Sequence, residues 1–290
     1  MKVKSTSRTS ASVRRAVRQA LGVALGAMLL TACSKVSEKT VPVTPHPTRQ
    51  AKNSYEQLER EARGAFLKDP RDVSTVEISA RKYKEAIAIR ADDYEGLWEA
   101  ARSCLWLGCY GADAKRKEYV QQGLEYANTA VKLKPEGEEG LFYNGALAGR
   151  LAELDFKYGA DATKIIESRM LQLIENKSTY LYGGPDRVLA IVYMRAPAAP
   201  LSIGNYDKAL THMQRAVHIE SHWLENQLYM AELEFRMGKK NNDPALTARA
   251  RGRLQQYFLR SGAKPSMAFG SAYEFKAWKK TARVLLEKYT

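Results

Sequence analysis

The sequence predicts an all-α protein in which helical hairpins stack one after another into a solenoid, with about four to five helix pairs and a C-terminal capping helix. From Tyr55 onward, apolar residues recur at three- and four-residue spacing, which is the pattern of helices with one buried face. That part of the chain lacks the strict alternation, bounded by turn residues, that indicates paired strands. A pattern of small residues also returns at a regular interval, which is typical of repeat proteins.

Proline and glycine set the boundaries of the expected helices. Asp69-Pro70, Pro135 and Asp243-Pro244 stop or start helices, because proline lacks an N–H and restricts the residue before it. Gly183-Gly184-Pro185 indicates a glycine at the end of one helix and a proline in the first turn of the next. The helices expected in order along the chain are 54–67, 73–90, 93–108, 115–134, 137–158, 161–177, 185–195, 205–220, 222–238, 244–260 and 270–288.

The small-residue pattern falls on the expected second helix of successive hairpins. In each copy, a small residue is followed by further positions four, three and five residues on. One copy is Gly123, Ala127, Ala130 and Pro135, and the other is Ala209, Met213, Ala216 and Ser221. This spacing resembles the second helix of a tetratricopeptide repeat (TPR), in which small side chains let two helices pack closely. The alternative is a generic helical bundle without superhelical order.

The spacing of these copies gives the length of the repeat. Ala86 and Ala130 are 44 residues apart, and Ala216 lies 86 residues after Ala130. This corresponds to units of about 43 residues with one copy skipped, which is expected to centre on Leu173. Because a standard TPR unit has about 34 residues, these units must carry insertions. The proline-bearing segment 196–204 is one of them.

The N-terminus has the organisation of a secretory signal. Six basic residues precede an uncharged stretch from Gln19 to Ala32, whose apolar core runs from Ala20 to Leu30. This core rises only about 16 Å as a helix, so it is too short to span a bilayer. The stretch ends in Leu30-Thr31-Ala32-Cys33, which resembles the bacterial lipobox whose cysteine is diacylated. We therefore expect a signal peptide at 1–32 and lipidation, such as palmitate, on Cys33.

The segment after the lipobox predicts where the protein is held. Residues 33–53 contain three prolines and no apolar periodicity, so we expect a semi-extended tether that reaches at most about 60 Å, followed by the helical body at 54–290. The expected location is the bacterial periplasm with a lipid anchor in the membrane. Ser34, in place of an aspartate, favours the outer membrane over the inner one. The alternatives are a cleaved soluble secreted protein and an uncleaved anchor.

Composition and charge narrow the classes of partner. With 45% hydrophobic and 27% charged residues, the chain is globular rather than disordered or multi-spanning. The net charge is +14, but six basic residues and no acidic ones lie in the first 32 residues. Export would separate the protein from nucleic acid, so no nucleic-acid partner is expected. The basic C-terminal third would face an acidic partner or anionic lipid headgroups.

The sequence contains no recognisable catalytic constellation. We therefore expect a protein that is not an enzyme and that needs neither a cofactor nor a metal. His218 and His222 are four residues apart, but no glutamate occupies the place that a zinc protease requires. Cys104 and Cys109 would point apart on one continuous helix, although a helix end at Gly108 would let them pair. Two unpaired cysteines buried between helices are favoured over a disulfide.

Aromatic residues gather on the expected first helices, which line the concave face of a TPR solenoid. We expect two or three of the seven to be exposed in a groove for an apolar ligand or a partner helix, and the others to be core. Arg187 is a candidate anion anchor, against the alternative of a structural ion pair. Tyr193 is expected in the groove wall. The seven aromatic residues are Trp98, Trp106, Phe142, Tyr143, Tyr193, Trp223 and Tyr229, and the candidate groove residues are Trp98, Trp106, Tyr143, Arg187, Tyr193 and Trp223.

A family resemblance is strongest between Gly183 and Ala231. The segment reads Tyr182-Gly183-Gly184-Pro185-Asp186-Arg187-Val188-Leu189, then Tyr193, Ala196-Pro197 and Pro200-Leu201-Ser202-Ile203-Gly204, then Lys208-Ala209-Leu210, Ala216-Val217, Glu225-Asn226 and Ala231-Glu232. It is similar to TatT, the T component of TPR-associated TRAP transporters, a family of periplasmic TPR lipoproteins. The likeness covers residues 75–240 and is weak on either side.

The resemblance implies a function as well as a fold. It implies a lipid-anchored accessory subunit that partners the periplasmic substrate-binding subunit of a TRAP transporter for organic acids or apolar anions, and that can form homo-oligomers. Such a subunit would bind its partner, the anion or both in a helical groove. The alternative is a TPR scaffold lipoprotein in envelope or outer-membrane assembly, which would use the same groove to bind a peptide.

Overall fold

The computed structural model describes residues 39–42, 49–262 and 271–289 of the chain. Its described residues form an all-α helical-hairpin solenoid, as predicted. The predicted signal peptide, the lipidation site Cys33 and most of the predicted tether lie outside these residues. Among the described helices, none is long and apolar enough to cross a membrane.

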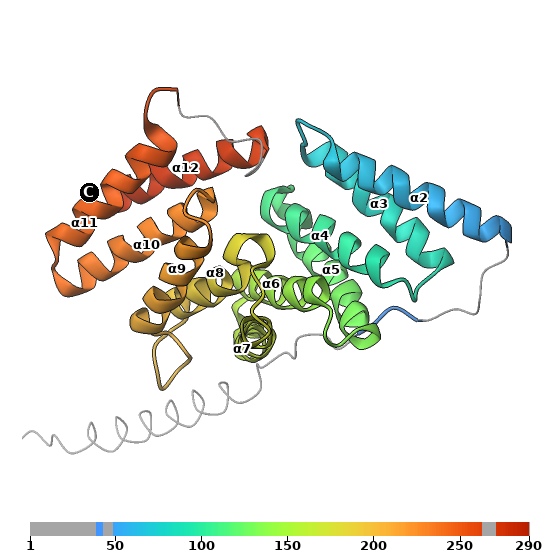
Figure 1. Ribbon diagram of the computed structural model, residues 1–290, viewed down its shortest axis with the longest axis horizontal. Helices are drawn as coiled ribbons and strands as arrows, with labels where there is room; N and C mark the ends of the chain where they lie inside the picture. The colour runs from blue at the N-terminus through green and yellow to red at the C-terminus, as the bar shows by residue number, and fades with distance from the viewer. Residues whose placement is uncertain (1–38, 43–48, 263–270, 290) are drawn as a thin grey trace, which may run out of the picture. The chain divides into compact units, whose positions relative to one another are not determined.

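Five helix pairs and one closing helix follow one another along the described chain (Figure 1). The two members of each pair pack closely against each other, and each first helix also contacts the first helix of the next pair. The pairs are α2 (Arg49–Leu67) with α3 (Val73–Ile89), α4 (Tyr94–Tyr110) with α5 (Asp113–Leu133), α6 (Glu138–Leu154) with α7 (Gly159–Glu175), α8 (Tyr180–Arg195) with α9 (Tyr206–Ile219), and α10 (Leu224–Asn241) with α11 (Pro244–Leu254), followed by α12 (Ala272–Tyr289).

The small-residue pattern marks the second helices, as the sequence predicted. Ala86, Ala130, Leu173 and Ala216 lie on α3, α5, α7 and α9, and each is at most 1% exposed. The skipped copy centred on Leu173 is therefore a genuine second helix. At Gly123, an added Cβ would lie 2.6 Å from the Cβ of Cys104 on α4. Since that is closer than real Cβ contacts, α4 and α5 can approach each other this closely only where one helix has no side chain.

Polar side chains cap several helices where the sequence predicted a boundary. Asp72 and Thr75 form a reciprocal capping box at the start of α3, and the Asn205 side chain accepts hydrogen bonds from two backbone N–H groups at the start of α9. Asp243 does the same at the start of α11, with Pro244 in the first turn. These side chains accept hydrogen bonds from N–H groups that the helix itself leaves unpaired.

Two α-helices end four or more residues earlier than predicted. The helix expected at 137–158 ends at Leu154, because Asp155 leaves the helical conformation and its side chain caps a short 3-10 turn at Phe156–Tyr158. The helix expected at 244–260 is α-helical only to Leu254 and continues as a π-helical turn over Gln255–Leu259. Apolar spacing of three and four residues continues through both segments and does not distinguish these helix types.

The break before the regular part of α8 is stronger than the sequence predicted. Leu181, Tyr182 and Gly183 all adopt left-handed backbone angles, with φ of 47°, 58° and 82°. Pro185 then lies in the first regular turn, as expected. The amide of Asn226 supports this conformation by donating hydrogen bonds to the carbonyls of Tyr182 and Ala216, at 3.1 and 2.9 Å.

Residues 39–42 of the predicted tether have no regular secondary structure and lie against α5. The Lys39 carbonyl accepts a hydrogen bond from the Asn128 side chain at 3.1 Å, and the Val41 N–H donates to the Thr129 hydroxyl at 2.9 Å. The Val41 side chain packs on the main hydrophobic core. Helix α2 also begins at Arg49, five residues before its expected start.

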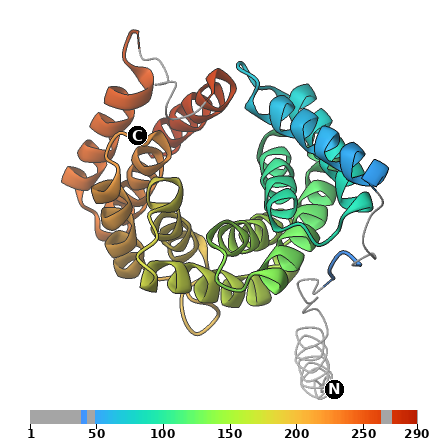
Figure 2. The same ribbon diagram turned by 45° about the vertical axis from the view of Figure 1, so that its right-hand side comes forward.

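The closing helix α12 makes two kinds of contact. Along its length it packs on α10 and α11 through a separate apolar cluster that includes Phe275 and Trp278. At its start it reaches the first hairpins, and both views place it beside the connection between α2 and α3 (Figures 1 and 2). Here the Glu274 carboxylate accepts a hydrogen bond from Trp106 Nε1 at 2.6 Å and lies 3.2 Å from Arg71 Nε. We call this contact of Arg71, Trp106, Tyr273 and Glu274 the α12 clasp.

The two described cysteines are unpaired. Cys104 is buried between α4 and α5, and Cys109 is partly exposed near the end of α4. Helix α4 continues to Tyr110, so Gly108 does not end it and the two side chains stay apart. Burial raises the pKa of the Cys104 thiol to about 12 and that of Cys109 to about 11. Both are therefore protonated near neutral pH, which makes them poor nucleophiles.

Candidate functional site

The first helices carry a row of aromatic rings near their N-terminal ends. The indole of Trp98 on α4 stacks on the ring of Tyr143 on α6, with 6.1 Å between centroids and 2° between planes. Tyr143 in turn meets Tyr180, at the start of α8, edge to face at 6.2 Å. Tyr143 is buried, whereas Trp98 and Tyr180 are half-buried. We call Trp98, Tyr143 and Tyr180 the aromatic row.

A guanidinium group lies beside the aromatic row. Arg102 follows Trp98 by one helical turn, and its guanidinium carbon lies 5.2 Å from the Trp98 ring and 4.2 Å from the Phe66 ring. Within the described part of the chain, its Nε and Nη2 atoms are buried without a hydrogen-bond acceptor. The nearest carboxylate is Glu99, 3.5 Å from Nη2. Glu99 is itself shared with Arg63, at 3.3 Å, and accepts a hydrogen bond from Tyr83.

The charge of the Arg102 guanidinium acts on the hydroxyl groups of both Tyr143 and Tyr180 and favours a lower pKa for each. The Tyr180 hydroxyl donates to the Tyr143 hydroxyl at 3.4 Å, which leaves the Tyr143 proton for another acceptor. Burial raises the pKa of Tyr143, and the Arg102 charge acts in the opposite direction. The row therefore combines flat apolar walls, a hydroxyl donor and a permanently charged guanidinium, which suits a ligand with an apolar body and an anionic group.

Arg187, by contrast, is used by the protein itself. It is 5% exposed and donates hydrogen bonds to the Leu181 carbonyl at 3.2 Å and to Asn226 Oδ1 at 2.9 Å. It also pairs with Glu225 at 3.4 Å. Burial lowers the pKa of its guanidinium, while Glu225 opposes that change. Arg187 thus holds the left-handed turn before α8, and its contacts favour the structural ion pair over the anion anchor.

Trp223 lies above this structural arginine. Its ring is 5.7 Å from the Arg187 guanidinium carbon, and the Tyr182 ring, which is 42% exposed, stacks on it at 4.5 Å. The structure therefore brings two pairs of the predicted groove residues together, Trp98 with Tyr143 and Arg187 with Trp223. Half-buried Trp98, Trp223 and Tyr229 are the three of the seven aromatic residues that retain partial exposure.

Tyr193 and Trp106 do not line an open groove. Tyr193 is 3% exposed because its ring stacks on His212 at 5.7 Å, with Lys208 Nζ at 5.1 Å, and its hydroxyl donates to Glu167 at 2.6 Å. Trp106 is 7% exposed and lies beneath α12 in the clasp. Each residue lies on the predicted first helix, but its ring is buried rather than exposed in a groove wall. Elements from elsewhere in the chain cover both rings.

A second group of charges on the first helices is paired within the protein. The buried carboxylate of Glu232 on α10 accepts hydrogen bonds from Arg195 at 2.7 Å and from Arg236 at 3.0 Å. Arg195 also donates to Glu153 on α6, at 2.6 Å. These side chains link α6, α8 and α10, so they hold the first helices together.

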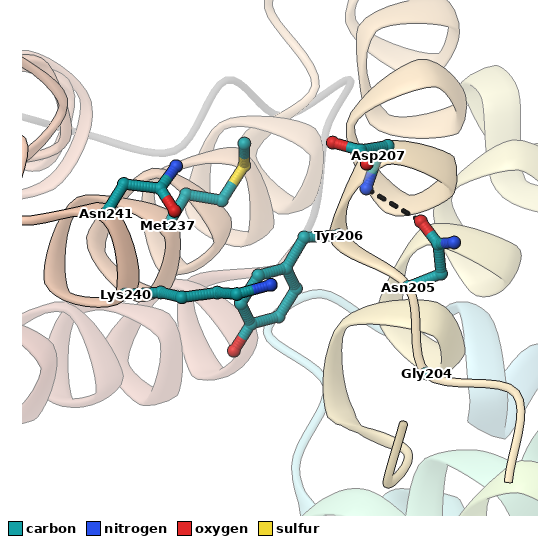
Figure 3. A pocket seen from close by; sticks show the side chains of 7 residues that line it. All are labelled: Gly204, Asn205, Tyr206, Asp207, Met237, Lys240 and Asn241. Carbon is teal, nitrogen blue, oxygen red and sulfur yellow. Dashed lines mark hydrogen bonds between the residues drawn. The ribbon is translucent and has the colours of Figure 1, made fainter. Parts of the chain in front are cut away.

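The insertion 196–204 forms an exposed loop between α8 and α9. Its ends are tied by hydrogen bonds from the Gly204 N–H to the Pro197 carbonyl at 2.9 Å and from the Asn205 N–H to the Tyr193 carbonyl at 2.8 Å. Leu201 is 86% exposed at the outer part of this loop. Where the loop returns to α9, it borders a hollow of about 190 Å³ in which the Lys240 side chain extends across the Tyr206 ring (Figure 3).

Sequence reasoning missed Arg102 and Tyr180 in this site. Tyr180 stands before the Gly-Gly-Pro break and was assigned to the connection between helices, so its contact with α6 was not expected. Arg102 could have been found from the sequence, because its four-residue distance from Trp98 places both on one face of a helix.

No protein-family model matches the chain, and no curated protein matches its sequence.

Proposed function

We propose that this chain is a lipid-anchored periplasmic accessory subunit of a TRAP-type uptake system. In this role it binds an apolar organic anion, a substrate-binding subunit or both at the aromatic row. The observation that carries the proposal is Arg102, whose two buried nitrogens lack hydrogen-bond acceptors among the described residues, beside stacked rings on successive first helices. The lipobox at Cys33 and the resemblance of residues 75–240 support the cellular role.

The chemistry required is binding without a covalent step. A carboxylate is planar and matches the donor geometry of a guanidinium, and an alkyl or aromatic tail would lie against Trp98 and Tyr180. Both charged and apolar parts are needed, because a guanidinium alone would accept any anion. The ligand would then pass to or from the cavity of the substrate-binding subunit.

Binding of octanoate tests the proposed site. We expect the purified full-length protein in detergent to bind octanoate more tightly than octanol, as measured by isothermal titration calorimetry. Arg102→Gln should weaken octanoate binding about tenfold, or ~1.4 kcal/mol, since it removes a charge-assisted contact. Arg102→Lys keeps the charge and should retain part of the affinity. Trp98→Ala should weaken octanoate and octanol alike.

Arg81→Gln is the matched control, because Arg81 is an exposed arginine on α3 that is not part of the row and pairs with Glu85 one turn along its own helix. It should leave octanoate binding unchanged. Thermal unfolding of each variant separates lost binding from lost folding. If wild type, Arg102→Gln and Arg81→Gln bound octanoate equally well, Arg102 would not be part of the site. If the protein bound an envelope-assembly peptide but no organic acid, the scaffold function would be favoured instead.

A further inference from the structure

A second candidate site lies on the other layer of helices, between α5 and α7. A surface hollow of about 180 Å³ is lined there by Asn128, Val131, Lys132 and Arg169. The hollow adjoins the described part of the predicted tether, because Asn128 both lines it and donates a hydrogen bond to the Lys39 carbonyl at 3.1 Å. The chain segment that leads to the proposed anchor is thus seated at the edge of this hollow.

A line of hydrogen bonds connects that segment to Arg169. Asn128 Oδ1 accepts from the amide of buried Asn144 at 2.7 Å, and Asn144 Oδ1 accepts from Arg169 Nε at 3.2 Å. Because Nε is held by Asn144, the guanidinium has a fixed orientation in the wall of the hollow. The position of Arg169 is therefore coupled to the seating of residues 39–42 on α5.

The charge of the hollow is positive and uncompensated. Within the described ranges, neither Lys132 nor Arg169 forms an ion pair with a carboxylate, in contrast to Arg195 and Arg236 on the first helices. Glu136 lies close to α7 at this point, and its carboxylate accepts hydrogen bonds from the neutral amides of Gln172 at 3.2 Å and Asn176 at 3.5 Å rather than pairing with either cation. An arginine and a lysine with no acidic partner are the residue types that bind a phosphate group.

Apolar side chains on the same two helices are partly exposed. Leu133, next to Lys132 on α5, is 41% exposed, and Leu171, two residues after Arg169 on α7, is 37% exposed. Residues one or two apart on a helix do not share a face, so these leucines do not line the hollow with Lys132 and Arg169. They would contact the acyl chains only around the edge of a membrane contact made by the charged pair.

The length of the chain places this hollow near the bilayer. Lys39 is only the sixth residue after Cys33, and a fully extended chain covers at most ~3.6 Å per residue. If Cys33 carries the acyl chains, as the proposed function requires, Lys39 lies within about 20 Å of the lipid headgroups. This is a third of the reach expected for a tether that runs free to the first helix. The part of α5 that contacts Lys39 through Asn128 is then held close to the bilayer.

We propose that Lys132 and Arg169 bind the phosphate of an anionic phospholipid headgroup in the membrane that holds the lipidated Cys33. The contact seats the α5/α7 side of the protein on the bilayer. The aromatic row lies on the first helices, α4, α6 and α8, and not on this layer, so it stays available to a soluble partner.

The site is tested by titrating the full-length lipidated protein, in a neutral detergent, with short-chain phosphatidylglycerol, phosphatidylcholine and inorganic phosphate, with native mass spectrometry as the readout. We expect phosphatidylglycerol to bind most tightly. The double variant Lys132→Gln/Arg169→Gln should lose about tenfold in affinity or more. The control Lys280→Gln/Arg283→Gln removes the same charge from exposed positions on α12 and should bind as wild type does.

Each contrary result has a distinct meaning. If both double variants lost the same affinity for phosphatidylglycerol, the specific site would be overturned. The lipid would then be attracted by the overall positive charge of the protein. Inorganic phosphate that binds as tightly as phosphatidylglycerol would overturn the lipid as the ligand. Palmitate labelling that persists in Cys33→Ser would contradict the anchor of the proposed function, while the titration would still decide the headgroup site.

Discussion

Replacing Glu274 with alanine is expected to lower the free energy of unfolding by about 3–5 kcal/mol, because it leaves a buried charge without its partner. Glu274 is 7% exposed and lies 3.2 Å from Arg71 Nε. It also accepts hydrogen bonds from Trp106 Nε1 and from the Ser271 N–H, both at 2.6 Å. The alanine variant would remove all of these contacts and separate α12 from the first hairpins.

This effect is measured by urea unfolding together with fluorine spectra of protein labelled with 5-fluorotryptophan. The chain has four tryptophans, and Trp106→Phe identifies the resonance of Trp106. In Glu274→Ala the chemical shift of that resonance should move toward the value of a solvent-exposed tryptophan. Glu287→Ala, an exposed glutamate on the same helix, is the control and should change neither readout. Identical behaviour of the two variants would show that the α12 clasp does not hold the helix.

Replacing Gly183 with alanine is expected to cost about 2–4 kcal/mol. Its φ of 82° is unfavourable for a residue with a side chain, and an added Cβ would lie 2.9 Å from the Cα of Ala216 on α9. Backbone cannot move aside as a flexible side chain can. Ala216→Leu should act on the same contact from the other side, at about 1–3 kcal/mol.

The matched control for this contact is Gly252→Ala. Gly252 lies on α11 with nothing within 4 Å of an added Cβ, so alanine should be neutral or should stabilise the helix by up to ~1 kcal/mol. The urea midpoint of the helical circular-dichroism signal measures all three variants. A Gly183→Ala midpoint equal to that of wild type would mean that α8 and α9 do not approach each other as closely as described.

Local signals predicted most of the fold because the helices are specified locally. Pro70, Pro135 and Pro244 end or start helices through their own backbone chemistry. The small residues at Ala130 and Ala216 mark second helices, since only small side chains permit the close approach of a paired helix. The equivalent position Leu173 followed from the period alone, without a small residue to mark it.

Long-range contacts account for what the sequence did not predict. Trp106 and Glu274 are 168 residues apart, and no periodic pattern relates them. Tyr193 is on a first helix as predicted, but His212 and Lys208 from α9 cover its ring. Helical spacing indicates which residues share a face, and it does not indicate what another element places over that face. The docking of Lys39 and Val41 on α5 was missed for the same reason.

Crosslinking in the native cell envelope tests the central claim most directly. A photoreactive side chain placed near the aromatic row of the full-length protein, with mass spectrometry of the products, should identify a periplasmic TRAP substrate-binding subunit. The crosslink should be lost in Trp98→Ala/Arg102→Gln and retained in Arg81→Gln. Crosslinks from this face to envelope-assembly proteins, with no substrate-binding subunit among the products, would contradict the uptake function.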